Sequence, residues 1–245
     1  MLTEPAAVWL LRHGQSQGNV VRDAARGKGL SVLDIADRDM DVPLSDLGQR
    51  QADAFGRWLS TQPKANRPEV VIASPYVRAV DTAQRVLGAA DLDMMVHQDE
   101  RLRERELGIL DLLTHEGVKA RFPDEFLRRQ RLGKFYHRPP GGESWVDVAL
   151  RLRSLRDSIA REHCGRRVLL VTHEVVIVLM RYLMEDLTEV QALTMGGGRI
   201  ANCALTTYNT QENGKPQLDL AGWTVPLEEA NEPITEAADA PVAPR

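Results

Sequence analysis

The sequence predicts an α/β fold: a three-layer α/β/α arrangement around a mostly parallel open sheet, with a helical cap insertion. Three observations lead to this prediction. Short apolar runs of strand length alternate with amphipathic segments of helix length along the chain, and parallel neighbours in a sheet need helical crossovers. Two of the apolar runs end directly at a histidine, His13 and His173. An Asn213-Gly214 pair between two further runs indicates a hairpin that finishes the sheet antiparallel.

The composition is that of an ordinary globular protein. The 245 residues are 43% hydrophobic and 27% charged with a formal net charge of -4, so we expect one large or two small domains. This charge favours neither nucleic acid nor an anionic membrane as a partner, and the apolar runs are too short to span a bilayer. Two cysteines exclude a disulfide framework and a four-cysteine zinc site, which predicts a reduced cytoplasmic setting.

The first half of the chain predicts three strands and two helices. Residues 6–11 are a buried strand by their apolar run, whereas residues 14–42 lack a period and are left as a long loop with at most a short helix. Ser45 caps a helix that extends to about residue 60 with one apolar face. Residues 70–73 are a second strand, and Ser74-Pro75 begins a helix that ends near residue 87. Residues 94–96 are a third strand.

The second half begins with the cap, residues 108–140, which has helical character over 116–122 and 125–132. An amphipathic helix follows over 145–159, then a buried strand over 168–172 and a helix over 174–184. Residues 203–208 and 217–223 are the antiparallel strands. We therefore predict a domain over residues 1–224. Residues 225–245 are rich in Glu, Ala and Pro, which predicts a disordered acidic tail.

Several polar residues follow the predicted strands. Arg12 and His13 follow the first, Ser74 and the helix of Arg78 follow the second, and His173 follows the fourth. Ligands of open parallel sheets bind at the carboxyl ends of the strands, so we expect these residues to converge there.

Two arginines and two histidines at one edge form a cationic pocket suited to a phosphoryl group. The guanidinium fork matches phosphate oxygens, and a neutral imidazole near pH 7 can attack phosphorus, which makes His13 the natural nucleophile. A carboxyl group held near the phosphate would protonate the departing oxygen. Glu104 or Glu106 fits this role.

The same residues resemble the signatures of the histidine phosphatase superfamily, also called phosphoglycerate mutase-like. The matching segments occur in order and cover about residues 7 to 210. They are Leu11-Arg12-His13-Gly14-Gln15-Ser16 with Asn19, Pro43 to Gly48, Ser74 to Ala83 with Arg78, Leu102-Arg103-Glu104 with Gly108, Gly141 to Ser144, and Val171-Thr172-His173.

The resemblance implies a phosphoglycerate mutase-like fold and a role for each matching residue. His13 would be phosphorylated, Arg12, Arg78 and His173 would hold the phosphoryl oxygens, and Glu104, favoured by its Leu-x-Glu spacing, would be the proton donor. Substrate binding would involve Gly14, whose carbonyl orients the His13 ring, together with Ser16, Asn19 and Glu174. The family needs no metal or organic cofactor. Glu174 departs from the Gly or small residue common after the second histidine, which adds a negative charge near the pocket.

Gln17-Gly18-Asn19 differs from the Trp-Asn pairing typical of the glycolytic mutases, and the block over 135–144 is more similar to phosphatase members. We therefore predict a metal-independent phosphatase acting on a small phosphorylated molecule. A mutase that moves phosphate between hydroxyls, and a non-catalytic phosphoester-binding regulatory protein, are the alternatives. The sequence leaves the substrate and the oligomeric state open.

Overall fold

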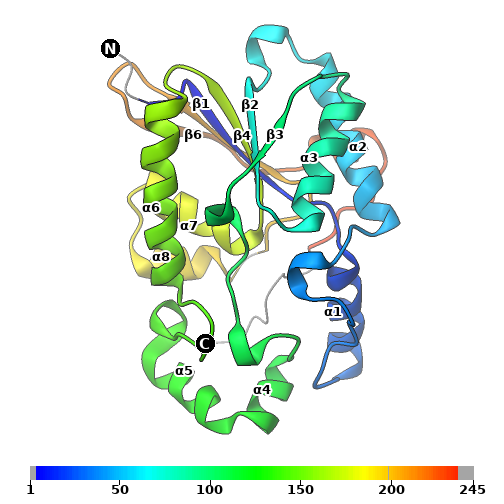
Figure 1. Ribbon diagram of the computed structural model, residues 1–245, viewed down its shortest axis with the longest axis vertical. Coiled ribbons are helices and arrows are strands. Elements are labelled where there is room, and N and C mark those ends of the chain that lie inside the picture. Colours follow the sequence, from blue (N-terminus) through cyan, green and yellow to red (C-terminus); the bar gives the residue numbers. More distant parts are fainter. Residues whose placement is uncertain (1–3, 198, 237–245) are drawn as a thin grey trace.

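A six-stranded mixed sheet forms the centre of the computed structural model, which describes residues 4–197 and 199–236 (Figure 1). The strand order is β3-β2-β4-β1-β5-β6. Strands β1, β2, β3 and β4 pair in parallel, and β5 and β6 continue the sheet antiparallel. The predicted fold class and the antiparallel hairpin are confirmed. The bounds are β1 Ala7–Arg12, β2 Val70–Ala73, β3 Val96–Gln98, β4 Arg167–Thr172, β5 Leu205–Thr210 and β6 Pro216–Trp223.

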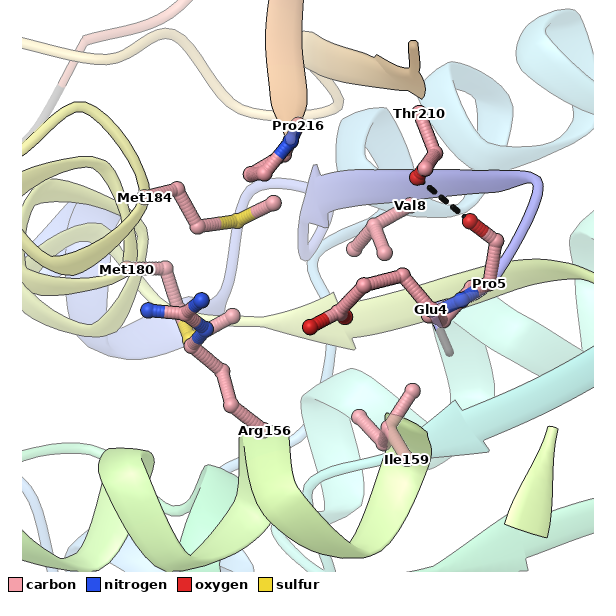
Figure 2. A pocket seen from close by; sticks show the side chains of 9 residues that line it. All are labelled: Glu4, Pro5, Val8, Arg156, Ile159, Met180, Met184, Thr210 and Pro216. Atoms are coloured by element: carbon pink, nitrogen blue, oxygen red, sulfur yellow. Dashed lines mark hydrogen bonds between the residues drawn. The ribbon is translucent and has the colours of Figure 1, made fainter. Parts of the chain in front are cut away.

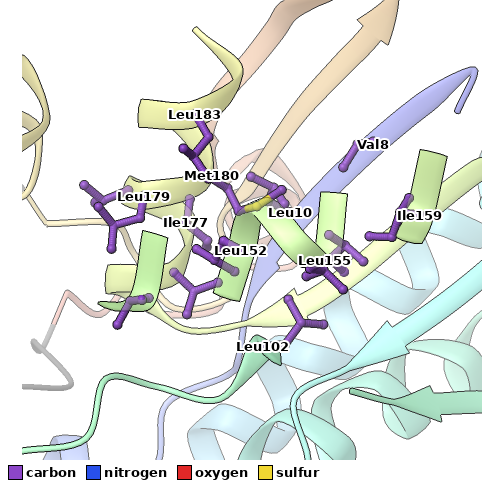
Figure 3. Close-up of a cluster of buried hydrophobic side chains, with 14 of the residues drawn as sticks. Val8, Leu10, Leu102, Leu152, Leu155, Ile159, Ile177, Leu179, Met180 and Leu183 are labelled. Carbon is purple, nitrogen blue, oxygen red and sulfur yellow. The ribbon is translucent and has the colours of Figure 1, made fainter. Parts of the chain in front are cut away.

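Each face of the sheet is covered by helices, because alternate residues of the buried strands point to opposite sides. On β4, Val168 and Leu170 pack into one apolar cluster, whereas Leu169 and Val171 pack into the other. The first cluster includes side chains of α6 (Trp145–Glu162) and α7 (Glu174–Met184) (Figure 3). The second includes side chains of α2 (Asp46–Thr61) and α3 (Val77–Ala89). This arrangement gives the three predicted layers.

The predicted helices over 45–60, 145–159 and 174–184 are confirmed by α2, α6 and α7. Ser45 and Ser144 cap the first two of these helices by accepting a bond from a backbone N–H. The start of α3 differs from the prediction. Ser74 does not cap the helix, which begins at Val77 after Tyr76, because Ser74 lies in the tight passage from β2 and its hydroxyl faces His173. Strand β3 begins two residues later than the predicted third strand.

The segment predicted to be a long loop with at most a short helix contains a regular helix of 12 residues, α1 (Gln17–Lys28). Ser16 and Asn19 form a reciprocal capping box, and Gly29 ends the helix with φ +64°, a conformation that favours glycine. The prediction did not locate this helix because little of it is buried, so the segment lacks the apolar period of a core helix. The rest of the segment contains one short 3-10 turn, Asp39–Asp41, and two isolated β-bridges, Ser16 to Leu44 and Val32 to Leu113.

The cap lies beyond the carboxyl ends of the parallel strands and contains α4 (His115–Arg121) and α5 (Pro123–Tyr136) (Figure 1). Its predicted helical character is confirmed, and α5 extends four residues further than expected. Thr114 caps α4, and Pro123 occupies the first turn of α5. Short 3-10 turns over Glu100–Leu102 and Gly108–Leu110 lead into the cap, and another, Lys64–Asn66, precedes β2.

Two short helices near the C-terminus were not predicted, α8 (Glu189–Met195) and α9 (Val225–Glu229). The predicted disordered tail is wrong for residues 225–236. Leu227 is fully buried in the second apolar cluster, and backbone and side-chain bonds hold Pro233 and Thr235 against the domain. The acidic composition of this segment gives no indication that the side chain of Leu227 is buried. The remainder of the predicted tail, 237–245, lies outside the described residues.

One small cavity lies at the edge of the sheet where β1 and β6 begin. The cavity, lined by Glu4, Arg156, Met184 and Pro216 among others, has a volume of about 20 Å³ (Figure 2). Such a volume accommodates about one water molecule. Among the described residues, no helix has the length and apolar character required to cross a bilayer.

Candidate active site

Four charged or ionisable residues meet at the opposite edge, where the parallel strands end. Arg12 is the last residue of β1, and His13 follows it. His173 follows β4, which is in register with β1, and Arg78 lies in the first turn of α3. All four are at most 2% exposed. We call them the strand-edge cluster, and their convergence is the arrangement that the sequence predicts.

The two histidine rings lie side by side. Their centroids are 5.1 Å apart, and the rings meet edge to face at 62°. Nδ1 of His13 is 2.7 Å from the carbonyl oxygen of Gly14. Because a carbonyl only accepts, Nδ1 carries the proton of the neutral ring, and the lone pair is on Nε2. The contact expected between Gly14 and the His13 ring is therefore present.

The loop after His13 requires glycine at position 14. A Cβ atom there would lie 2.4 Å from the carbonyl oxygen of Gly48. The Gly14 N–H donates to Oγ1 of Thr82 at 3.0 Å, and this hydroxyl donates to the carbonyl of Arg78 at 2.6 Å. These bonds connect the His13 loop directly to the helix that carries Arg78.

Both guanidinium groups of the cluster face carboxylates. Nη2 of Arg12 is 3.9 Å from Oε2 of Glu174, and Nη2 of Arg78 is 3.1 Å from Oδ2 of Asp39. Such pairing offsets the free-energy penalty of burying a charge. Glu174 was expected near the pocket, and it lies there. Asp39 was missed because its loop carries no periodic pattern or motif.

His173 is held from two sides. Its Nε2 is 2.8 Å from Oγ of Ser74, and its ring is 5.1 Å from that of Tyr76. The Tyr76 ring also lies under the Arg78 guanidinium, whose central carbon is 4.9 Å from the ring centroid. Tyr76 is a further site residue that the sequence did not single out, because only Arg78 of the matching segment Ser74 to Ala83 was assigned a role.

The two candidate acids have different surroundings. Glu104 is 1% exposed, and its Oε1 accepts the Arg105 backbone N–H at 2.7 Å. Its segment is fixed at the end of β4, because Oγ1 of Thr172 donates to the Leu102 carbonyl at 2.8 Å. Glu106 is exposed and accepts the hydroxyl of Tyr76 at 2.7 Å. Burial and this bond raise the pKa of Tyr76, so the hydroxyl stays protonated and donates.

Ser16 and Asn19 lie in the same buried region, and each is at most 3% exposed. A further residue, Asn202, connects them to His13. Its amide donates to the His13 carbonyl at 3.1 Å and to Oδ1 of Asn19 at 3.3 Å, and its Oδ1 accepts the hydroxyl of Thr235 at 2.9 Å. The residue that precedes the tight turn at Cys203 thus supports the loop, a role that only tertiary contacts show.

The charge of the site comes from side chains. No group of three or more His, Cys, Asp and Glu residues within 4–197 and 199–236 is arranged to hold a metal ion. The Arg12 and Arg78 guanidinium groups stand beside the histidines instead. This arrangement suits an anion with several oxygens.

Comparisons with known proteins point the same way. The family model for the histidine phosphatase superfamily (branch 1) matches residues 8–224. A relative from Gloeobacter violaceus, named 2,3-bisphosphoglycerate-dependent phosphoglycerate mutase 2, is 32% identical over 212 residues, which cover 85% of this chain and 88% of the relative. A bifunctional protein of Mycobacterium tuberculosis is 33% identical over 74% of this chain, and the match spans 45% of that longer protein.

A solved structure of a mycobacterial glucosyl-3-phosphoglycerate phosphatase, in complex with VO3, is also similar. It superposes with a TM-score of 0.67 at 28% identity and covers 89% of this chain and 98% of its own. The relatives thus include both mutases and phosphatases.

Proposed function

This chain belongs to branch 1 of the histidine phosphatase superfamily, and from that premise we propose that it hydrolyses a phosphomonoester through a phosphohistidine at His13. The observation that carries the proposal is the approach of the two buried histidine rings, 5.1 Å apart, with Arg12 and Arg78 at the same sheet edge. Uncatalysed hydrolysis of phosphate monoesters is among the slowest of reactions, so nucleophile, anion pocket and acid must act together.

In the first step, Nε2 of His13 attacks phosphorus and the bond from phosphorus to the ester oxygen breaks. The Gly14 carbonyl keeps the proton on Nδ1, so the lone pair of Nε2 becomes the N–P bond. Glu104, protonated at the start, gives its proton to the departing oxygen. The alcohol leaves, and the phosphoryl group is on His13.

In the second step, the Glu104 carboxylate accepts a proton from water. The water oxygen attacks phosphorus, the N–P bond breaks, and inorganic phosphate forms with His13 neutral again. Arg12, Arg78 and His173 hold the phosphoryl oxygens in both steps, where each charge-assisted hydrogen bond contributes about 1.5–3 kcal/mol. Asn19 and Ser16 are assigned to the substrate side of the pocket. Because two guanidinium groups supply the positive charge, we propose that the reaction needs no metal.

The test is turnover of para-nitrophenyl phosphate by the full chain. We expect His13→Ala to abolish release of nitrophenol, whereas His97→Ala, a change at an exposed histidine of β3, leaves it unchanged. Rapid acid-free quenching and intact mass measurement should show one added phosphoryl group on the wild type and none on His13→Ala. Activity should survive EDTA. Turnover that persists in His13→Ala would refute the proposal.

A mutase reaction is the second candidate, favoured by the name of the Gloeobacter relative. It predicts that activity on a phosphoglycerate depends on a bisphosphoglycerate primer and yields an isomer instead of inorganic phosphate. Release of inorganic phosphate in the absence of the primer would show that the reaction is hydrolysis. Tight binding of phosphoesters with neither product would favour the regulatory, non-catalytic alternative.

A further inference from the structure

The segment that carries Glu104 lies outside the helices and strands. Residues 104–107 connect the 3-10 turns Glu100–Leu102 and Gly108–Leu110, so the bonds of a helix or a sheet do not fix their backbone. Buried backbone N–H and C=O groups need hydrogen bonds all the same. The block from Gly141 to Ser144, one of the segments that match the family, supplies several of them.

Two glycines allow this block to approach the Glu104 segment closely. A Cβ atom at Gly142 would lie 2.7 Å from the Glu106 carbonyl oxygen. One at Gly108, whose φ of +55° also favours glycine, would lie 2.1 Å from the Pro140 carbonyl oxygen. At this contact the Glu143 N–H donates to the Glu106 carbonyl at 2.9 Å. The two segments are therefore bonded through their main chains.

The Glu143 side chain adds an ion pair to this contact. Its Oε2 accepts the Glu106 N–H at 3.1 Å, and its Oε1 is 2.8 Å from Nη2 of Arg103. Arg151 binds both oxygens, with Nε 3.0 Å from Oε1 and Nη2 3.1 Å from Oε2. This is the bidentate geometry of the stronger charge-assisted bonds. The side chains of Glu143 and Arg151 are 13% and 10% exposed, so solvent screens their attraction little.

Arg151 also holds the main chain on the other side of Glu104. Its Nη1 donates to the Arg101 carbonyl, and its Nη2 is 3.3 Å from the Glu104 carbonyl oxygen, to which it donates. Arg151 lies on α6, next to Leu152 of the first apolar cluster. The bonds of the ion pair thus extend from three residues before Glu104 to two residues after it, and they start from a helix that is packed on the sheet.

Stability alone does not account for such a pair. Burying two charges costs free energy that their attraction does not always offset, and apolar side chains of similar size often stabilise a protein as well or better. Apolar side chains at 143 and 151 would leave the Glu104 carbonyl and the Glu106 N–H without these partners. The ion pair therefore supplies a fixed geometry that an apolar contact would not.

We propose that Glu143 and Arg151 are positioning residues for the proton donor: their ion pair fixes the main chain around Glu104 so that its carboxyl group reaches the departing oxygen. A catalytic group displaced by about 1 Å can lose about a hundredfold in rate, so such support has a large effect. The proposal rests on the proposed function, in which Glu104 gives its proton to that oxygen. The two residues act through Glu104 and not on the substrate.

The experiment compares two aryl phosphates of similar shape, para-nitrophenyl phosphate and phenyl phosphate. para-Nitrophenolate is stable as an anion and leaves with little help from an acid, whereas the more basic phenolate needs the proton of Glu104. The measured quantity is kcat/KM, which reports the step in which Glu104 acts as the acid. We expect Arg151→Met to lower it for phenyl phosphate by about tenfold more than for para-nitrophenyl phosphate.

Variants of Glu143 grade the effect. Glu143→Ala should change the ratio of the two esters in the same direction as Arg151→Met. Glu143→Gln keeps an oxygen that can accept the Glu106 N–H, and it should change the ratio less. Arg151→Lys keeps the charge without the bidentate contact, so we expect an intermediate effect.

Two controls separate positioning from a general loss of structure. Arg181→Met breaks a partly buried ion pair with Glu185, 2.8 Å long, in the last turn of α7, and it should leave the ester ratio unchanged. In a Glu104→Gln background the acid is already absent, so Arg151→Met should change the ratio by less than about twofold. Equal losses on both esters, or a further change of the ratio in the double variant, would overturn the proposal.

Hydrogen exchange tests the contact without turnover. Exchange of the Glu106 N–H, which donates to Glu143, measures how firmly the segment is held. Arg151→Met should speed this exchange by about tenfold or more, and Arg181→Met should not. If exchange also rises throughout β4, the variant has lost its fold, and Arg151→Lys takes its place.

The two measurements distinguish the failure of each proposal. If the wild type hydrolyses neither ester, the proposed function fails, and the exchange of the Glu106 N–H still decides whether the ion pair holds the segment. If hydrolysis proceeds through His13 and the ester ratio is the same in the wild type and in Arg151→Met, the positioning role fails alone.

Discussion

The strand-edge cluster contrasts with a second set of cations, which we call the cap cluster: Arg105, which follows Glu104, and Arg129 and Lys134 of α5. The first lies at the ends of paired strands, is at most 2% exposed, and is held by bonds such as that of Nδ1 of His13 to the Gly14 carbonyl. The second takes two of its three cations from α5, and within residues 4–197 and 199–236 the half-buried side chain of Arg129 makes no hydrogen bond or ion pair.

This difference suits the strand-edge cluster to the reaction itself and the cap cluster to the selection of substrates. A reacting group needs fixed geometry, which parallel strands in register provide. A charged group that binds a part of the substrate away from the reacting atoms needs a less exact position, because a charge acts over several ångströms. We therefore expect changes in the strand-edge cluster to reduce turnover of every substrate and changes in the cap cluster to reduce turnover of some.

The largest effect should separate two carboxylates that stand at the boundary between these regions. Glu104→Gln removes the buried acid, and we expect kcat for alkyl phosphates to fall by about 10² to 10⁴, the usual contribution of general acid–base catalysis. Glu106→Gln removes only an exposed acceptor of the Tyr76 hydroxyl and should change kcat by less than about threefold. Steady-state kinetics on both variants provide the measurement. A larger loss of kcat in Glu106→Gln than in Glu104→Gln would identify Glu106 as the proton donor.

An intermediate effect is expected from Asn202, which is fully buried and supports the loop of the strand-edge cluster. Asn202→Ala leaves the His13 carbonyl and the Thr235 hydroxyl without its bonds, which should lower the free energy of unfolding by about 2 kcal/mol. Urea denaturation measures this change. Thr235→Ser keeps the hydroxyl and serves as the control, with little change expected. Unaltered stability in Asn202→Ala would mean that the loop is fixed by other contacts.

The smallest effect concerns pH and the cap cluster. Because the pKa of Lys134 is lowered to about 8, its ammonium loses the proton as pH rises through that value. Arg105 and Arg129 keep their charge over this range. KM for an anionic phosphoester should then rise between about pH 7.5 and 9, where the phosphate is almost entirely ionised. Lys134→Met should show no such rise, and a flat wild-type profile would mean that the Lys134 ammonium does not act on the substrate.

The prediction from sequence was most complete where a feature is local. Apolar runs identified the strands that end at Arg12 and Thr172, and short motifs placed His13, Arg78 and His173 at one edge. It failed where few apolar residues mark an element. Helix α1 has few buried residues, so its capping box of Ser16 and Asn19 was recognised only in the structure. Leu227 is buried in a segment whose acidic composition predicts disorder.

The sequence by itself determined the six strands, the helices with a buried apolar face, the family and the residues of the strand-edge cluster, because each depends on periodicity or on neighbours in the chain. Only the tertiary structure decided that Asp39 faces Arg78, that Asn202 supports His13, and that Arg105, Arg129 and Lys134 lie together. These contacts join segments far apart in the chain. Their free energies depend on burial and on distances between charges, and neither is set until the chain is packed.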